Sequence, residues 1–493
     1  MVFLKNIKCA AWKIVLILAL IGAAVLAILL AQPDYHASFV VTGDVAEVLT
    51  VESIDGFDTT TAVRDGKRYT GIALSDLIDA AQPVAADNTV VIRGSDGLLA
   101  EVDANQLQGM HVVYTADNGW EMINDFHPPS SNIKNIAEVW VVAKSTVREI
   151  AVNVIRTDEN ILSLTPGQFF MRQTAFAPLF HGESEVDVQN EAYHVAVYTE
   201  RRFLDVTDIA PDAQSVLVMG EEGGYAYDAS PGRITLIGNT LYYVCSDGKT
   251  SMENVRGVLI DPPNASNMDA FQEAINNVDN DVRTMVVLVD GFAYHQYTYA
   301  TDNGIAPYMA SLAPAKLATS VYKPVTHAGL SAMLTGAPPC DNGIYQRGMS
   351  ELQVPDIFTR MSAMDKTSQY IEGSINIVNT SMRATLNADR DGDGLTDNEV
   401  FESAMEAIAS DADFLFVHFH GVDDLGHDYG DIAQPVMDKI TEVDGYLQTM
   451  AEAFSGRLII TTDHGMHSTN DGGSHGVFRY EDIIIPYISV VVE

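Results

Sequence analysis

The chain is poor in cysteine and in positive charge, and each shortage excludes a class of protein. Its 493 residues include only three cysteines, Cys9, Cys245 and Cys340, so it is not a disulfide-stapled scaffold. Whether Cys245 and Cys340 pair stays open at this point. Lys and Arg number 28 against 67 Asp and Glu, a net charge of −39. Such a surface repels nucleic-acid phosphates, so no nucleic-acid binding is expected.

One long apolar run, residues 14–31, contains no charged side chain and follows Lys5, Lys8 and Lys13. It is long enough to span a bilayer, and the lysines orient the N-terminus toward the cytoplasm. A cleaved signal peptide shares the basic flank, but the length of the run favours an uncleaved anchor. We therefore predict that residues 1–34 form a single-pass anchor in the cell membrane and that the remainder is extracytoplasmic.

Two β-rich segments are expected after the anchor, at residues 35–148 and 149–262, because short β-branched runs alternate there with turn residues. Residues 69–77 and 203–209 both precede such a strand and a glycine-containing turn. The second segment is therefore either a repeat of the first or a separate use of the same hairpin pattern. The strands expected are residues 38–41, 89–93 and 137–143 in the first segment and residues 215–219, 233–237 and 241–245 in the second.

The pattern changes in the C-terminal segment, residues 281–493, where strands alternate with helices. This alternation predicts an α/β fold with a largely parallel sheet flanked by helices. Residues 433–454 carry apolar side chains three or four positions apart, typical of a helix with one buried stripe. The other elements expected are a helix at residues 326–334 and strands at residues 284–289, 374–378, 414–419 and 458–461.

Carboxylates and imidazoles follow the predicted strands of this segment. Six of the 13 histidines lie between His418 and the C-terminus. Asp290, Asp423 and Asp463 each come soon after a strand, and the carboxyl ends of parallel strands meet at one edge of a sheet. Because imidazole and carboxylate together are the ligands of zinc and similar divalent metals, the pattern predicts a metal-dependent active site.

The order of these motifs resembles the alkaline phosphatase superfamily, particularly its nucleotide pyrophosphatase/phosphodiesterase branch. The resemblance covers residues 283–493 and implies an alkaline-phosphatase-like catalytic domain with two zinc ions, or similar metals, at the sheet edge. It rests on Val289-Asp290-Gly291-Phe292, Thr326 upstream of Thr335-Gly336, Asp423-x-x-x-His427, Asp463-His464-Gly465 and His475-Gly476.

The resemblance also implies a role for each residue. Thr326 would be the nucleophile, activated by metal coordination, and would form a covalent phospho-threonine. Taken singly, Thr326 is an ordinary helix N-cap, and the Asp and His residues are ordinary loop residues. His418 and His420 are interpreted as packing or supporting residues, and His327 and His467 stay unassigned. One implied metal set is Asp423, His427 and His475; the other is Asp290, Asp463, His464 and Thr326.

The implied activity is hydrolysis of a phosphodiester or pyrophosphate in a small molecule or lipid headgroup. A phosphomonoesterase is the alternative; the sequence shows no evident Arg or Lys for a second phosphate charge, which favours the diester. Relatives often carry an Asn shortly after the nucleophile, where this chain has Gly329, so the phosphoryl-oxygen contact stays open. A third alternative is a calcium-stabilised surface binding protein with a vestigial catalytic domain; the complete ligand set argues against it.

Residues 35–148 resemble the molybdopterin-binding fold of sulfite-oxidase-type enzymes. This resemblance rests on residues 69–77, the turn at residues 94–97 and the strand at residues 133–142. That family binds its metal through a cysteine, and residues 33–148 contain none. The resemblance therefore implies the fold without the redox chemistry.

A calcium-binding loop is predicted as an insertion near residues 389–400. Oxygen ligands at loop positions 1, 3, 5 and 9 and Gly394 at position 6 match such a loop. Position 12 is Val400 instead of Glu, so the loop resembles those of dockerin-like or thrombospondin-type repeats. A solvated acidic turn is the alternative. The candidate ligands are Asp389, Asp391, Asp393, Leu395 and Asp397.

Overall fold

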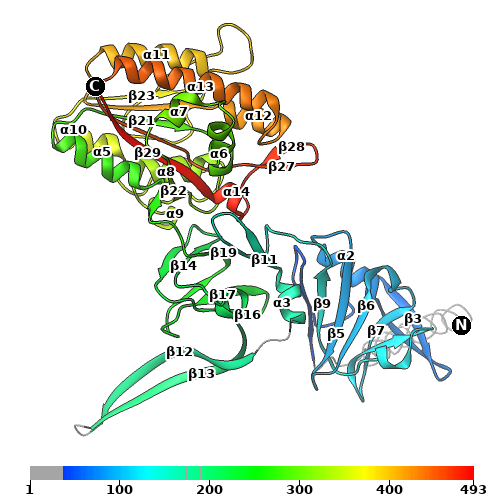
Figure 1. Ribbon diagram of the computed structural model, residues 1–493. Coiled ribbons are helices and arrows are strands. Elements are labelled where there is room, and N and C mark those ends of the chain that lie inside the picture. The colour runs from blue at the N-terminus through cyan, green and yellow to red at the C-terminus, as the bar shows by residue number, and fades with distance from the viewer. Residues whose placement is uncertain (1–36, 173–174, 189–190) are drawn as a thin grey trace, which may run out of the picture. The chain divides into compact units, whose positions relative to one another are not determined.

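The structure, a computed structural model, describes residues 37–172, 175–188 and 191–493 (Figure 1). Contacts divide the chain after Ser145 into two compact units, residues 1–145 and 146–493. The predicted anchor, residues 14–31, lies outside the described residues. Within the described ranges, no helix is long and apolar enough to cross a membrane.

Residues 37–145 of the first unit form two sheets and the α-helix α2 (Leu74–Ala81). The five-stranded sheet has the order β2-β1-β9-β5-β6, and the four-stranded sheet has the order β3-β4-β7-β8. The buried side chains of α2 pack with Trp120 in one core. The strands are β1 (Phe39–Gly43), β2 (Leu49–Val51), β3 (Thr59–Arg64), β4 (Lys67–Ala73), β5 (Asn88–Gly94), β6 (Leu99–Asp103), β7 (Met110–Thr115), β8 (Gly119–Asn124) and β9 (Ile136–Ala143).

The second unit begins with a segment whose strands have the same connectivity, apart from the additional edge strand β18. Its first sheet has the order β11-β10-β19-β14-β15, and its second has the order β12-β13-β16-β17-β18. The parallel pair β1–β9 corresponds to the parallel pair β10–β19, and α4 (Val206–Ile209) follows β13 as α2 follows β4. The two β-rich segments therefore have similar topologies. The strands are β10 (Val152–Ile155), β11 (Asn160–Leu164), β12 (Ala175–Val188), β13 (Glu191–Asp205), β14 (Val216–Gly220), β15 (Tyr225–Asp228), β16 (Arg233–Ile237), β17 (Thr240–Val244), β18 (Ser251–Glu253) and β19 (Val255–Ile260), with helix α3 (Pro166–Met171).

An eight-stranded sheet forms the centre of the C-terminal segment, in the order β20-β22-β29-β26-β21-β25-β23-β24. The central strands β26, β21, β25 and β23 are parallel, and β29 runs antiparallel beside β26. The mixed α/β class predicted from the sequence is confirmed. The strands are β20 (Ala265–Ser266), β21 (Thr284–Val289), β22 (Lys316–Thr319), β23 (Ser368–Glu372), β24 (Thr385–Leu386), β25 (Phe414–Phe419), β26 (Gly456–Thr461) and β29 (Ile484–Val492).

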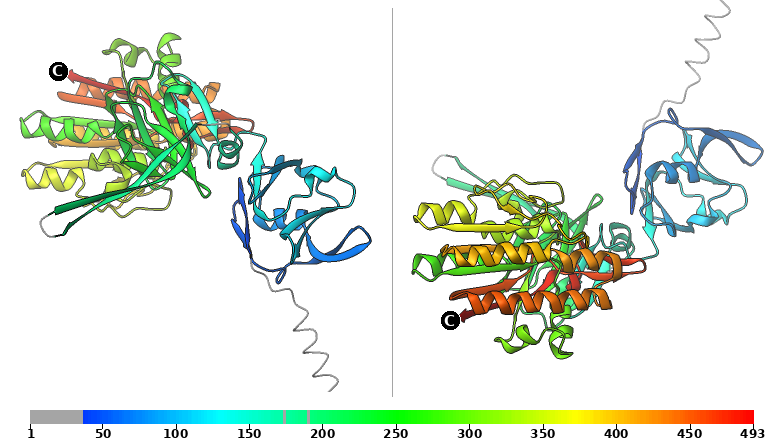
Figure 2. Two further views of the ribbon diagram at one scale, coloured as in Figure 1. Left: turned by 90° about the horizontal axis from the view of Figure 1, so that it is seen from below. Right: turned by 90° about the horizontal axis from the view of Figure 1, so that it is seen from above.

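Helices cover both faces of this sheet (Figures 1 and 2). Alternate residues of β21 enter different cores: Val287 packs with α11 and α13, and Val286 packs with α5, α8 and α10. A strand buried on both faces needs an unbroken apolar run, which β21 has. The helices are α5 (Asp269–Asp279), α6 (Tyr294–Asp302), α7 (Pro307–Ser311), α8 (Thr326–Thr335), α9 (Pro339–Asn342), α10 (Ile357–Ala363), α11 (Asp397–Ala409), α12 (Gly421–Tyr429), α13 (Gln434–Ala453) and α14 (Tyr480–Ile483).

The second β-rich segment packs directly on the α/β segment within the same unit. Phe478 lies in an apolar cluster with Leu217 and Leu259 of β14 and β19. A Cβ atom on Gly257 of β19 would lie 2.0 Å from the Phe478 ring, so this close approach requires glycine. Asn160 accepts a hydrogen bond from the backbone N–H of Tyr480 at 3.2 Å. These contacts hold the chain just beyond the site at His475.

Most predicted elements of the α/β segment match the structure, but the strand expected at residues 374–378 is wrong. That stretch is irregular, and the strand next to β25 is β23, which ends at Glu372. The apolar pattern around Ile375 and Ile377 comes from residues that line a cavity and not from a strand. Cys245 and Cys340 are both free.

Candidate active site

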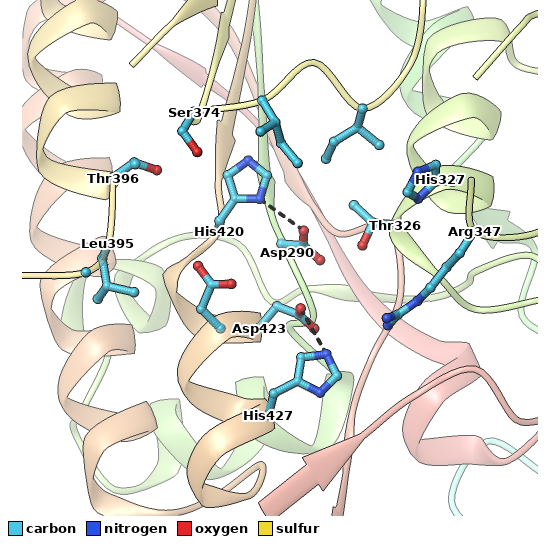
Figure 3. Close-up of a pocket in the computed structure, with 14 residues that line it drawn as sticks. Asp290, Thr326, His327, Arg347, Ser374, Leu395, Thr396, His420, Asp423 and His427 are labelled. Carbon is cyan, nitrogen blue, oxygen red and sulfur yellow. Dashed lines mark ion pairs between the residues drawn. The ribbon is translucent and has the colours of Figure 1, made fainter. Parts of the chain in front are cut away.

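A cavity of about 380 Å³ lies at the carboxyl ends of β21 and β25 (Figure 3). Thr326 and Arg347 lie on one side of it and face Asp423 and His427. The cavity is lined by Asp290, Thr326, His327, Arg347, Ser374, Ile375, Ile377, Gly394, Leu395, Thr396, His420, Asp423, Asp424 and His427.

Three carboxylates converge here without enough donors to satisfy them. Asp290 directly follows β21, and Asp463 follows β26 by two residues; both are at most 2% exposed. One oxygen of each aspartate, Asp290 Oδ1, Asp423 Oδ1 and Asp463 Oδ2, is buried without a hydrogen-bond partner. Buried polar atoms in folded proteins are nearly always paired, so these oxygens form a candidate cation site.

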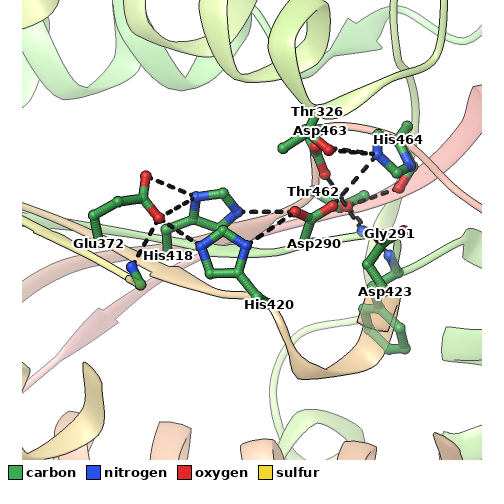
Figure 4. Close-up of polar contacts among 12 residues, drawn as sticks. Asp290, Gly291, Thr326, Glu372, His418, His420, Asp423, Thr462, Asp463 and His464 are labelled. Atoms are coloured by element: carbon green, nitrogen blue, oxygen red, sulfur yellow. Dashed lines mark hydrogen bonds and ion pairs between the residues drawn. The ribbon is translucent and has the colours of Figure 1, made fainter. Parts of the chain in front are cut away.

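His464 turns one ring nitrogen toward this cluster. Its Nδ1 lies 3.0 Å from the carbonyl oxygen of Gly465, so the Nδ1–H donates to that carbonyl. The other nitrogen, Nε2, is 3.3 Å from Asp290 Oδ1, from Asp463 Oδ2 and from Thr326 Oγ1 (Figure 4). Asp290, Asp463, His464 and Thr326, one of the sets predicted from the sequence, are thus brought together around one point.

In the other predicted set, both histidines contact Asp423. His427 Nε2 is 3.3 Å from Asp423 Oδ2, and His475 Nε2 is 3.7 Å from Asp423 Oδ1. His427 Nδ1 faces the carbonyl of Gly473 at 3.3 Å, and His475 Nδ1 faces that of Pro324 at 2.8 Å. In both rings a carbonyl fixes the Nδ1–H, so Nε2 is the ring nitrogen that carries the lone pair toward the site. His475 also stacks on His464, with ring centroids 3.8 Å apart.

Burial and mutual charge shift the pKa values in this cluster. Burial and the neighbouring Asp290 raise the pKa of Asp463 to about 7. Burial alone would lower the pKa of His464, but the charges of Asp463 and Asp290 outweigh it and raise that pKa to about 9. Burial and the adjacent His464 lower the pKa of His475 to about 2, so His475 is neutral, as a metal ligand must be.

Two glycines allow the elements of the site to approach each other. Gly291, with φ +68°, lies so close to Asp423 that a Cβ atom would be 2.7 Å from its Oδ1. A Cβ atom on Gly329 of α8 would lie 2.3 Å from the carbonyl oxygen of Asp463. No asparagine fits at Gly329, because α8 packs on the strand end that carries Asp463.

Arg347 is a cavity residue that the sequence did not reveal. It lies in the loop between α9 and α10, and its Nη2 donates to His475 Nε2 at 2.7 Å. The sequence showed no evident Arg or Lys for a second phosphate charge, and the structure places Arg347 in the cavity. A single arginine in an irregular loop carries no periodicity or motif by which it could have been found.

Of the four other histidines considered in the sequence analysis, three lie at the site and one lies outside the cavity. His418 and His420, interpreted as supporting residues, both contact Asp290, and His420 lines the cavity. Of the two unassigned histidines, His327 also lines the cavity. His467 instead pairs with the buried carboxylate of Asp482 at 2.6 Å.

The predicted calcium loop is only partly assembled as expected. Carboxylate oxygens of Asp389, Asp391 and Asp393 lie within 4.8 Å of one another on the surface. Asp397 points away from them: it is fully buried and accepts the backbone N–H groups of His420 at 2.9 Å and of Gly421 at 3.1 Å. Asp397 therefore holds the start of α12, the helix that carries Asp423 and His427.

The family comparison agrees with the predicted resemblance. Residues 357–490 match the type I phosphodiesterase / nucleotide pyrophosphatase family. A search of curated proteins gives no match. The matched region contains Asp423, His427, Asp463, His464 and His475.

Similar solved structures include phosphonoacetate hydrolase from Sinorhizobium meliloti 1021 in complex with phosphonoformate, at 18% identity and a TM-score of 0.32, covering 38% of this chain and 57% of that one. Murine ectonucleotide pyrophosphatase / phosphodiesterase 5 is 19% identical, with a TM-score of 0.31 and coverage of 38% and 58%. The C-terminal periplasmic domain of EcEptC from Escherichia coli is 16% identical, with a TM-score of 0.31 and coverage of 43% and 73%. The chain thus spans little more than half the length of the first two.

Proposed function

We propose that this chain, whose residues 357–490 match the type I phosphodiesterase / nucleotide pyrophosphatase family, is a metal-dependent hydrolase of phosphodiesters or pyrophosphates. The proposal is carried by the convergence of the Thr326 hydroxyl and His464 Nε2 with carboxylate oxygens that accept no hydrogen bond. A hydroxyl is a poor nucleophile at its ordinary pKa and needs such an environment to react.

Two divalent ions, zinc or a similar metal, fit the available donor atoms. Asp290, Asp463, His464 and Thr326 would hold one, and Asp423, His427 and His475 would hold the other. When bound, such ions lower the pKa of the nucleophile and neutralise charge on the attacking and leaving oxygens. The support is the set of buried carboxylate oxygens that accept no hydrogen bond, because a cation would satisfy them.

The reaction of the chain's own residues then proceeds in two steps. Thr326 is the first residue of the ten-residue helix α8, whose N-terminal end favours a phosphate group. Thr326 Oγ1 loses its proton and bonds to phosphorus while the ester oxygen leaves and takes up a proton. Water then attacks the phospho-threonine, breaks the Oγ1–P bond and restores the hydroxyl.

Arg347 bears on the choice of substrate. Its guanidinium donates a hydrogen bond to His475 Nε2. A metal ion on His475 would bind through the lone pair of this same nitrogen. Metal binding would therefore release Arg347 to a phosphate oxygen in the same cavity, as a charge-assisted donor. This favours a small molecule or lipid headgroup with more than one phosphate charge, such as a pyrophosphate. It also makes a phosphomonoesterase, whose substrate is a dianion, the second candidate.

Replacing the nucleophile tests the mechanism. Thr326→Ala should lower kcat/KM for bis-p-nitrophenyl phosphate by at least about 10³-fold, because the covalent route is lost. Acid quenching of the wild-type reaction should leave a phosphoryl group on the peptide that contains Thr326. Thr449→Ala, an exposed change in α13, is the matched control and should leave turnover unchanged.

Undiminished turnover in Thr326→Ala would rule out Thr326 as the nucleophile. No turnover of diester, monoester or pyrophosphate by the zinc-loaded wild type would instead favour a calcium-stabilised binding protein with a vestigial site.

Arg347→Ala separates the two substrate classes. A hydrogen bond to a charged group contributes about 1.5–3 kcal/mol, so kcat/KM for a pyrophosphate or monoester should fall by about 10- to 100-fold. The bis-ester, with one negative charge, should lose much less. Arg383→Ala, at an exposed position outside the cavity, serves as the control. An equal loss for all three substrates would contradict a role for Arg347 in reading phosphate charge.

We also propose that residues 14–31 anchor the enzyme and that its catalytic segment faces outside the cytoplasm; the support is the apolar run and its lysine flank. The full chain should stay in the membrane fraction during alkaline carbonate extraction, and deletion of residues 1–36 should release it. External protease should cleave the anchored form in intact cells. A mature N-terminus located after residue 31 would show that a signal peptide is removed instead.

Calcium binding at Asp389, Asp391 and Asp393 is proposed for the acidic loop. The neighbouring Glu399 supports it: its Oε1 accepts the backbone N–H of Arg390, and its buried Oε2 has no partner. Because Gly394, Leu395 and Thr396 line the cavity and Asp397 holds α12, a calcium-ordered loop would stabilise one wall of the site.

Isothermal titration with CaCl₂ tests this loop in the zinc-loaded protein. One site with a Kd on the order of 10⁻⁴–10⁻³ M is expected, the range of extracellular modules. Asp391→Asn should abolish the binding heat, and Asp438→Asn, an exposed change in α13, should retain it. Equal binding heats in wild type and Asp391→Asn would assign the signal to other acidic groups.

A further inference from the structure

A buried carboxylate, Glu372, joins the two histidines at the end of β25. Glu372 ends β23 and is fully buried. His418 Nδ1 lies 3.0 Å from its Oε1, and His420 Nε2 lies 2.5 Å from the same oxygen. Tyr370 Oη and the backbone N–H of Gly373 also donate to Glu372, at 2.6 and 2.9 Å. Glu372 is therefore satisfied and holds both imidazole rings in place.

The opposite nitrogens of the two rings point at one oxygen of Asp290 (Figure 4). His418 Nε2 is 3.2 Å and His420 Nδ1 is 3.4 Å from Asp290 Oδ2. The three ligating groups lie within 4.8 Å of one another. The second oxygen, Asp290 Oδ1, faces His464 on the other side, so the carboxylate of Asp290 lies between two clusters of donors.

This arrangement is the one that protein metal sites use to orient histidine ligands. An imidazole that binds a metal through one nitrogen donates its other N–H to a carboxylate or carbonyl, which fixes the ring. Here one glutamate does so for two rings, and both rings present their second nitrogen to the same carboxylate. Packing alone would not require His418 and His420 to share both an inner and an outer carboxylate.

An entry route and free coordination positions are also present. His418 and Asp290 are buried, but the side chain of His420 is 16% exposed and lines the cavity together with Thr396 and Asp424. A metal ion can therefore reach the three donors from the cavity, and water or substrate oxygen can complete its coordination. Two imidazole nitrogens and one carboxylate oxygen suit zinc, iron(II) or manganese(II) and not calcium.

We propose that Asp290 Oδ2, His418 Nε2 and His420 Nδ1 form a third divalent-metal site, with Asp290 bridging it to the site around His464. Each ring binds through the nitrogen that faces Asp290 and keeps its other N–H on Glu372. His418 and His420 belong to neither of the two metal sets of the proposed phosphoryl transfer. The third site therefore stands on its own contacts and requires no particular substrate.

Metal counting tests the site in the full-length protein. After chelator treatment, reconstitution with excess Zn²⁺ and desalting, mass spectrometry of the metals should give three zinc ions per chain. His420→Gln should retain two, because the other ligands stay in place. His181→Gln, an exposed change in the β12–β13 hairpin, should retain three. Two ions per chain in both the wild type and His420→Gln would overturn the proposal.

Anomalous diffraction at the zinc edge tests the site in the wild-type protein, so the result does not depend on whether a variant folds. A peak among Asp290, His418 and His420 in wild-type crystals supports the third site, and peaks only beside His464 and His475 exclude it. A failure of the proposed function would give a different result: the anomalous peak beside Asp423 and His475 would be missing. Asp423→Asn should remove that ion and leave the peak at His418.

Discussion

The negative charge of Asp290, buried at the carboxyl end of the central strand, is the constraint on which the rest of the site depends. Burial alone would raise the pKa of this carboxyl, but hydrogen bonds from His418 and His420 hold it well below its ordinary value. On the opposite side, Asp463 and Asp423 add further carboxylates without enough donors. Such a concentration of buried negative charge requires compensating positive charge, which connects the packing of the sheet to the proposed metal chemistry.

The two β-rich segments resemble each other in topology, and the second one contacts the catalytic segment. They share the order and pairing direction of their common strands and the position of a helix, although residues 1–145 form a separate unit and the second segment packs in the same unit as the α/β segment. The second β-rich segment supplies Gly257, against which Phe478 packs three residues beyond His475. Its effect on the site is therefore to support the loop that presents His475.

Sequence patterns predicted the strands at residues 284–289 and 414–419 well, because parallel strands buried on both faces are mostly apolar; Thr284 and His418 are the polar residues in these two. The helix at α8 and the positions of Asp290, Asp423 and Asp463 near strand ends followed from the same signals. The strand expected at residues 374–378 was wrong, and this error concealed Glu372, which ends the real strand as Asp290 follows β21. If β23 had been predicted correctly, the carboxylate of Glu372 at its end would have been a candidate site residue in the sequence analysis.

The sequence by itself determined which residues could be ligands and nucleophile, since the alternation of strands and helices and the order of the Asp and His motifs are local properties. Tertiary structure decided what stands beside them. Arg347 reaches His475 across 128 residues, Glu372 reaches His418 across 46, and Asp397 leaves the acidic loop to hold His420 and Gly421. Gly329 excludes an asparagine only because Asp463 packs against it. Such contacts depend on which segments the sheet brings together, and no local pattern records them.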